Sequence, residues 1–144
     1  MRKIKKLIIH CSASPTNTTI SSIKRYWREV LKWKNVGYHI IIEFNGNIVF
    51  LDEFENVVNG CKGHNYDSIS VATIGGIDEH GKPKDNRSPA QIRSLIRVID
   101  AIYEDYPDIT LVSHHTLNPN KACPSYSAES FWAGVLLGRS ISKN

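Results

Sequence analysis

The sequence predicts an α/β fold: a single domain over residues 1–144, with a central mixed β-sheet of about five strands flanked by helices. Short apolar segments of strand length alternate with segments of helical periodicity, in the order β-α-β-β-β-α-β-α, which is typical of a sheet with helices on its faces. The length of 144 residues suits one compact domain. Hydrophobic residues make up 41% of the chain and charged residues 22%, as in an ordinary globular protein.

The first part of the chain predicts a buried strand followed by a helix. A continuous apolar run indicates a strand over Lys5–His10. After a polar loop, Thr18 or Thr19 can cap a helix, and we expect Val36-Gly37 to end it. Apolar residues at helical spacing would place one face of this helix in the core; they are Ile20, Ile23, Trp27, Val30 and Leu31.

Three further strands are expected before the second helix. Tyr38–Phe44 and Ile48–Leu51 are separated by Asn45-Gly46, which predicts a type I′ hairpin because both residues tolerate positive φ. The following segment, 52–67, has no regular pattern. Ile69–Ile74 is another apolar strand, and a glycine pair closes it.

The second half predicts a long helix, a last strand and a short helix. Ser88-Pro89-Ala90-Gln91 combines a serine cap, a proline at the first helical position and a glutamine that completes a capping box. Pro107 ends this helix, and Ile109–Ser113 is the last strand. We expect a loop over 114–125 and a helix over Ala128–Leu137. The expected buried stripe of the long helix is Ile92, Leu95, Ile96, Ile99, Ile102 and Tyr103.

Charge and hydropathy exclude several classes of protein. The net charge of +4 favours anionic partners, but the basic residues are dispersed, so we expect no nucleic-acid interface. The apolar runs are far shorter than the roughly 20 residues of a membrane-spanning helix, so no membrane insertion is expected. The basic N-terminus precedes only three apolar residues, which predicts synthesis in the cytoplasm without a signal peptide. Three cysteines argue against a disulfide framework.

Two histidines and a cysteine fall where strands end. His10 ends the first predicted strand, His114 follows the last, and Cys123 lies nine residues further on. Imidazole nitrogen and thiolate sulfur are preferred zinc ligands, and three protein ligands leave a fourth position for water, as in catalytic sites. Each residue also has a structural interpretation, since histidines are often surface residues and free cysteines are often small buried hydrophobes. The residues alone therefore indicate a possible metal site.

Five segments together resemble one known family. The sequence is similar to the type 2 N-acetylmuramoyl-L-alanine amidases, which include short phage lysozyme-like amidases and peptidoglycan-recognition proteins. The resemblance runs in the family's order from about residue 7 to 133. The segments are Ile8-Ile9-His10-Cys11-Ser12-Ala13, Val36-Gly37-Tyr38-His39-Ile40-Ile41, Gly63-His64-Asn65-Tyr66-Asp67-Ser68-Ile69-Ser70-Val71, Gly75-Gly76-Ile77-Asp78 and Lys121-Ala122-Cys123-Pro124-Ser125.

The resemblance implies a zinc site. His10 matches the first zinc histidine and Cys123 the zinc cysteine, whereas His114 and His115 both lie at a suitable distance for the second histidine. Adjacent residues at a strand end point to opposite sides, so one of the two is excluded. Ser113-His114 fits the family's order of a small residue and then the ligand, which favours His114 and leaves His115 outside the ligand set.

The resemblance also implies catalytic and substrate-binding roles. Tyr38 matches the family's active-site tyrosine, and Lys121 matches a lysine that can polarise the scissile carbonyl. His64 and Asn65 match a loop near the peptide groove. The sequence departs from the phage pattern at Gly60, where such members often carry a histidine.

The implied function is a zinc-dependent hydrolase that cleaves the amide between N-acetylmuramic acid and L-alanine in peptidoglycan. Such a bacteriolytic enzyme, a phage endolysin for example, would act on the cell wall after release or export, as a monomer. A binding module that does not cleave the wall is the main alternative. Family members of that kind typically lack the zinc cysteine, so Cys123 favours the enzyme.

Overall fold

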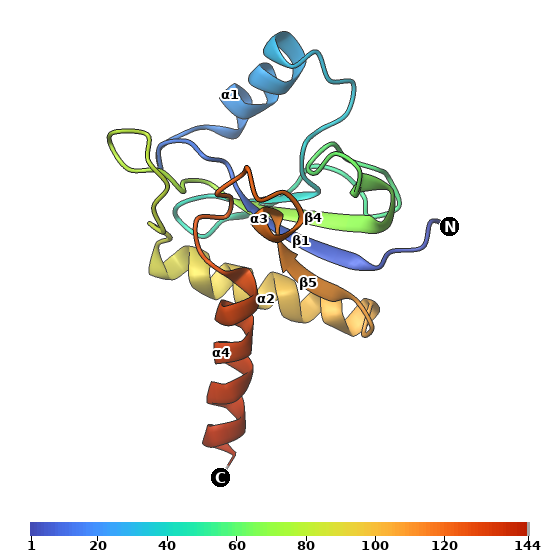
Figure 1. Cartoon of the computed structure of the whole chain (residues 1–144), viewed down its shortest axis with the longest axis vertical. Helices are drawn as coiled ribbons and strands as arrows, with labels where there is room; N and C mark the ends of the chain where they lie inside the picture. Colours follow the sequence, from blue (N-terminus) through green and yellow to red (C-terminus); the bar gives the residue numbers. More distant parts are fainter. Residues whose placement is uncertain (144) are drawn as a thin grey trace.

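The computed structural model describes residues 1–143 and has a five-stranded mixed sheet in the order β3-β2-β4-β1-β5 (Figure 1). This confirms the predicted fold class. The strands are β1 (Lys6–Cys11), β2 (Ile40–Ile42), β3 (Ile48–Phe50), β4 (Ser68–Thr73) and β5 (Thr110–Ser113). The helical segments are α1 (Ile20–Arg25), η1 (Tyr26–Val30), η2 (Asn65–Asp67), α2 (Pro89–Asp105), α3 (His114–Leu117) and α4 (Ala128–Ser142).

Strand β1 is the centre of the parallel part of the sheet. It pairs in parallel with β4 on one side and with β5 on the other. Strand β2 is parallel to β4, and the edge strand β3 is antiparallel to β2. The carboxyl ends of β1, β2, β4 and β5 therefore meet at one edge of the sheet, where the side chains that follow these strands converge.

Helices cover both faces of the sheet, and Figure 1 shows α1 and α2 on opposite sides of it. Alternating residues of the strands serve the two faces. Leu7 and Ile9 of β1 belong to the core that α2 and α4 cover. On the other face, Ile41 and Ala72 pack with Trp27 beneath α1 and η1. His10 is even-numbered in β1 and therefore shares the α1 face of the sheet.

The first helix differs from its prediction in its second half. Helix α1 ends at Arg25 and continues as the π-helical η1, in which the Leu31 N–H donates to the Tyr26 carbonyl at 3.1 Å. The wider turn changes the angle between successive side chains, so the 3.6-residue period no longer applies. Val30 and Leu31, predicted to be buried, are 63% and 37% exposed.

The predicted hairpin is present, but its strands are shorter and its turn is of another type. Only Ile40–Ile42 of the predicted strand Tyr38–Phe44 is paired. Gly46 has a φ of 91° and its N–H donates to the Glu43 carbonyl, whereas Asn45 keeps a negative φ. A type I′ turn needs positive φ at both central residues, so that assignment was wrong.

The second half follows the prediction closely at helix starts and less closely elsewhere. The Ser88–Gln91 capping box is present. The buried face of α2 is rotated relative to the prediction, because Gln91, Ser94 and Val98 are buried while Ile92, Ile96 and Tyr103 are half-buried. The predicted loop 114–125 begins with the single turn of α3, and α4 extends to Ser142 rather than Leu137. Within residues 1–143 no helix combines the length and apolar character needed to cross a bilayer.

We expect Gly76→Ala to destabilise the protein because the backbone there packs directly against Cys11. Gly76 has a φ of 96°, and a Cβ would lie 2.3 Å from the Cys11 sulfur. The left-handed conformation alone costs about 1 kcal/mol for an L-residue, and displacing Cys11 adds to that loss. Urea unfolding should therefore show a loss of about 2 kcal/mol or more.

Gly81→Ala is the matched control for this substitution. Gly81 also has a positive φ, 77°, but nothing lies within 4 Å of its added Cβ. The free energy of unfolding of Gly81→Ala should fall only by the cost of the left-handed backbone conformation, about 1 kcal/mol. Equal losses in the two variants would contradict the argument from packing against Cys11.

Candidate metal centre and cleft

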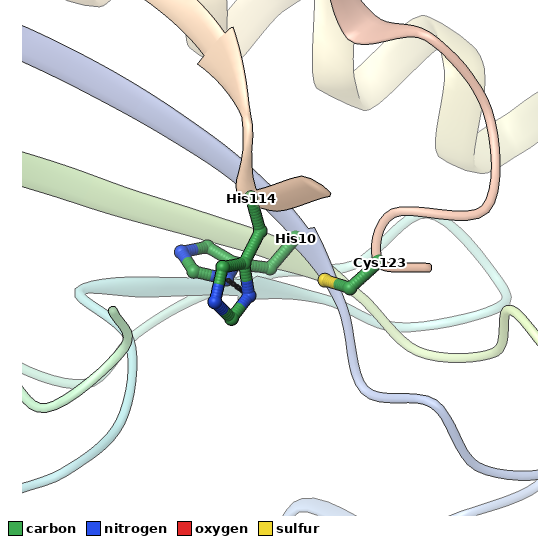
Figure 2. A group of neighbouring side chains, drawn as sticks. All are labelled: His10, His114 and Cys123. Carbon is green, nitrogen blue, oxygen red and sulfur yellow. Dashed lines mark hydrogen bonds between the residues drawn. The ribbon is translucent and has the colours of Figure 1, made fainter. Parts of the chain in front are cut away.

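Three side chains from two distant parts of the sequence meet at the carboxyl edge of the sheet (Figure 2). His10 lies near the end of β1, His114 follows β5 directly, and Cys123 lies in the loop before α4. The Nδ1 atoms of His10 and His114 are 3.2 Å apart. One ligand atom from each of the three residues fits in a group whose members all lie within 4.8 Å of one another. Figure 2 shows the Cys123 sulfur directed towards the two rings.

His10 is buried and held at both ring nitrogens. Its exposed fraction is 1%, and its Nε2 lies 3.0 Å from the Ser70 hydroxyl on β4. Burial, followed by the proximity of His114 and His39, lowers the pKa of His10 well below its ordinary value. His10 is therefore a neutral imidazole at pH 7, the form that can donate a lone pair to a metal.

The structure distinguishes His114 from His115. His114 faces His10, whereas the His115 ring nitrogen Nδ1 lies 2.6 Å from the Lys121 carbonyl oxygen, on the loop that carries Cys123. The His115 N–H also donates to the Cys123 carbonyl at 2.8 Å. The predicted separation of the two side chains is present, but its stated reason was wrong. The residues form a helical turn, where successive side chains diverge by about 100°.

Cys123 is anchored to the end of β1. The backbone N–H of Cys11 donates to the Cys123 sulfur at 3.0 Å. Hydrogen bonding with the Cys11 side chain, together with burial, raises the pKa of Cys123 well above its ordinary value. The thiol is therefore protonated unless a cation lies beside it, because a nearby positive charge favours the thiolate.

Glu129, in the first turn of α4, fixes the point where β5 becomes α3. Its carboxylate accepts hydrogen bonds from the Ser113 N–H, the Ser113 hydroxyl at 2.6 Å and the Thr116 hydroxyl. Burial acts to raise the pKa of Glu129, but these hydrogen bonds outweigh it and lower the pKa to about 2. The ionised carboxylate thus fixes residues on both sides of His114 in the sequence, Ser113 before it and Thr116 after it.

A cleft of about 650 Å³ opens onto the three-residue cluster, with His114 and Cys123 in its wall. Trp27 and Trp33 contribute aromatic surface to it. Tyr38 lines the cleft as well, with its ring centroid 4.9 Å from that of His10, and its hydroxyl donates to the Cys11 carbonyl at 3.2 Å. Burial and the neighbouring thiols raise the pKa of Tyr38 well above 10, so the phenol stays protonated and acts as a hydrogen-bond donor.

Of the remaining predicted site residues, the structure brings Lys121 to the cleft. It lines the cleft and contributes to the lowered pKa of His114, after burial and together with His64. In the described part of the chain, His64 and Asn65 are not among the lining residues. The Asn65 side-chain oxygen accepts the Cys61 N–H at 2.7 Å and so stabilises its own loop. Substrate contact by this pair stays a prediction.

Sequence reasoning missed Ser70, Glu129 and Lys62. Lys62 also lines the cleft, but a single lysine in an irregular segment carries no pattern. Ser70 could have been found, because it interrupts the apolar strand on the face that alternation assigns to His10. Glu129 follows a helix cap, and an acidic residue in the first turn of a helix is common for reasons unrelated to a site. Its contact with Ser113 exists only in the folded chain.

Comparison with known proteins identifies the family of this chain. Residues 1–126 match the family model described as N-acetylmuramoyl-L-alanine amidase. The endolysin of Escherichia phage T7 is 35% identical over 127 residues, 88% of this chain and 83% of that protein. The Ph2119 endolysin from the Thermus scotoductus MAT2119 bacteriophage superposes with a TM-score of 0.80 at 20% identity, over 93% of this chain and 85% of that one. Peptidoglycan recognition protein SD from Drosophila superposes with a TM-score of 0.73 at 13% identity, over 86% and 76%.

The family match covers most of the chain, and both kinds of solved structure share its fold. The chain belongs to the N-acetylmuramoyl-L-alanine amidase family. The resemblance drawn from the five sequence segments is thereby confirmed.

We expect Glu129→Gln to remove a pH-dependent part of the stability. The pKa of Glu129 is depressed from 4.5 to about 2 in the folded state, so its contribution is fully present above about pH 4.5. The contribution is lost as the pH falls from about 4.5 to 2. Urea unfolding between pH 2 and 7 should show a smaller acid dependence in Glu129→Gln than in the unmodified protein. Parallel stability–pH curves would contradict this assignment. Glu104→Gln, on an exposed position of α2, is the control.

Proposed function

We propose that this protein is a zinc-dependent amidase that cleaves the bond between N-acetylmuramic acid and L-alanine in peptidoglycan. The observation that carries the proposal is the convergence of His10, His114 and Cys123 beside a cleft, in a chain of the amidase family. The endolysin relatives support the cell wall as the substrate and a phage lysis enzyme as the context.

The three residues fit a zinc ion by chemistry and by spacing. Two imidazoles and a thiolate form a catalytic donor set. With zinc–nitrogen bonds of about 2.0–2.1 Å, two tetrahedral ligand nitrogens lie about 3.3 Å apart, and a nitrogen and a sulfur about 3.6 Å. The observed nitrogen pair is 3.2 Å apart, and no pair in the group exceeds 4.8 Å. The site is thus preformed to within about 1 Å, mostly in the position of the sulfur.

Zinc in this position would act as a Lewis acid and lower the pKa of a water molecule to about 7. The chain's own residues supply the rest of the chemistry. The protonated Tyr38 hydroxyl, adjacent to His10 in the cleft, can transfer its hydrogen bond from the Cys11 carbonyl to a substrate oxygen. The Lys121 ammonium can stabilise negative charge that develops on the carbonyl oxygen during attack.

The charge of the cleft suits a peptide that carries carboxylates. Lys62 and Lys121 both line it, and no Asp or Glu is among the lining residues that the structure describes. A peptide released from the glycan strand ends in a carboxylate, so a cationic cleft favours the peptide side of the scissile amide. Tyr26 and Trp33, also in the cleft wall, offer ring surface of the kind that sugars can pack against.

The decisive experiment is incubation of the purified protein with isolated peptidoglycan, with and without a chelator. We expect release of stem peptides with a new N-terminal L-alanine, loss of that release with chelator, and recovery on adding zinc. Mass spectrometry of the soluble products measures this. Release of glycan fragments with new reducing ends, or binding without release, would contradict the amidase; release that ignores the chelator would contradict zinc.

The choice of histidine is tested by two adjacent substitutions. His114→Ala removes one of three donors and should weaken zinc binding by more than about 100-fold. His115→Ala removes only a contact to the Lys121 carbonyl, so zinc affinity should stay within about tenfold. Competition with a chromogenic chelator measures both. Stronger loss in His115→Ala would overturn the assignment.

A further inference from the structure

Ser70 is a buried polar residue on the face of β4 that carries the candidate metal centre. Its exposed fraction is 0%, and its hydroxyl lies 3.0 Å from His10 Nε2. Strands β1 and β4 pair in parallel with Ile8 opposite Ser70 and His10 opposite Ala72, so the two side chains share one face as diagonal neighbours. Within the described residues, this hydroxyl is the hydrogen-bond partner of that ring nitrogen.

We infer that Ser70 is a positioning residue that fixes the His10 ring so that Nδ1, and not Nε2, faces His114 and Cys123. A hydrogen bond at one imidazole nitrogen fixes the direction of the ring, and where the partner accepts the proton it leaves the lone pair on the other nitrogen. With the Nε2 proton donated to the Ser70 oxygen, the lone pair is on Nδ1, which lies 3.2 Å from His114 Nδ1. The inference rests on the proposed function only in assigning a metal to that lone pair.

The backbone of Ser70 is itself held on both sides by His39. The Ser70 N–H donates to His39 Nδ1 at 3.0 Å, and the His39 N–H donates to the Ser70 carbonyl at 2.9 Å. His39 is fully buried, and its Nε2 lies 2.8 Å from the Asn56 carbonyl oxygen. The serine is therefore rigidly placed, and its hydroxyl has a defined direction towards His10.

A loop backbone packs against this pair on one side. A Cβ added at Gly60 would lie 2.8 Å from the Ser70 oxygen, 3.2 Å from His10 Cε1 and 2.7 Å from the Gly37 carbonyl oxygen. The space beside the hydroxyl is thus filled by protein atoms. If the hydroxyl were removed, a buried imidazole nitrogen would lose its partner.

The test compares Ser70→Ala with Ser68→Ala. Ser68 is on the same face of β4, is 1% exposed, and its hydroxyl has no hydrogen-bond partner among the described residues. Each substitution removes one buried hydroxyl from the same strand, but only Ser70→Ala removes a partner of His10. Both variants should stay folded, which thermal unfolding checks.

The first readout is the His10 tautomer, measured by nitrogen-15 NMR on the metal-free protein at neutral pH. The unmodified protein and Ser68→Ala should carry the proton on Nε2, whereas Ser70→Ala should show a mixture of tautomers. The second readout is zinc affinity by chelator competition, expected to fall 10–100-fold in Ser70→Ala and to change less than about threefold in Ser68→Ala.

The outcomes separate this inference from the proposed function. A proton on Nδ1 in the unmodified protein, or an unchanged tautomer in Ser70→Ala, would overturn the role of Ser70 whether or not zinc binds. Equal affinity losses in the two variants would also overturn it. Absence of zinc binding by the unmodified protein, with the tautomer shifted in Ser70→Ala alone, would support the positioning role and contradict the zinc-dependent function.

Discussion

The site depends on the pairing of β1 with two parallel neighbours. Ile9 lies opposite Ser113 of β5, so His10, the next residue of β1, lies beside His114, which directly follows β5. On the other side, pairing with β4 places Ser70 beside the same histidine. A slip of one residue in either register would turn these side chains to the opposite face. Because β1 is buried on both faces, its apolar residues oppose such a slip. The positions of the site residues are therefore as stable as the register of β1.

This arrangement places polar groups where burial is costly. His10, His39 and Ser70 are each at most 1% exposed in the middle of an apolar sheet. Burying such groups without partners costs several kcal/mol, so they persist because they satisfy one another through hydrogen bonds. The Nδ1 atom of His10 faces His114 in the cleft wall and so connects these three buried residues to the cleft. A sheet that needed only stability would place apolar side chains there, so the network indicates a functional constraint.

The sequence allowed the fold class, most strand positions and the capping box of α2 to be predicted, because these depend on local periodicity and caps. The exposed Val30 and Leu31 were mispredicted because a π-helical turn breaks the period that the prediction assumed. The turn at Asn45-Gly46 was misassigned because two turn types share the same residues. His10 and Cys123 were predicted as metal ligands from the family resemblance, since two residues 113 positions apart in sequence have no local signature. Ser70 and Glu129 act through tertiary contacts, which no local pattern encodes.

The loop that carries Cys123 shows why the cysteine reaches the histidines without a strand of its own. Only eight residues separate it from His114, so closing the loop costs little conformational entropy. The loop is fastened to the helical turn before it by both contacts of His115, and to β1 by the Cys11 N–H. Beyond it, Glu129 ties α4 back to Ser113. His10 is thus positioned by the sheet and Cys123 by a short braced loop, while His114 lies at the junction of the two supports. A change at either support reaches the cluster through that histidine.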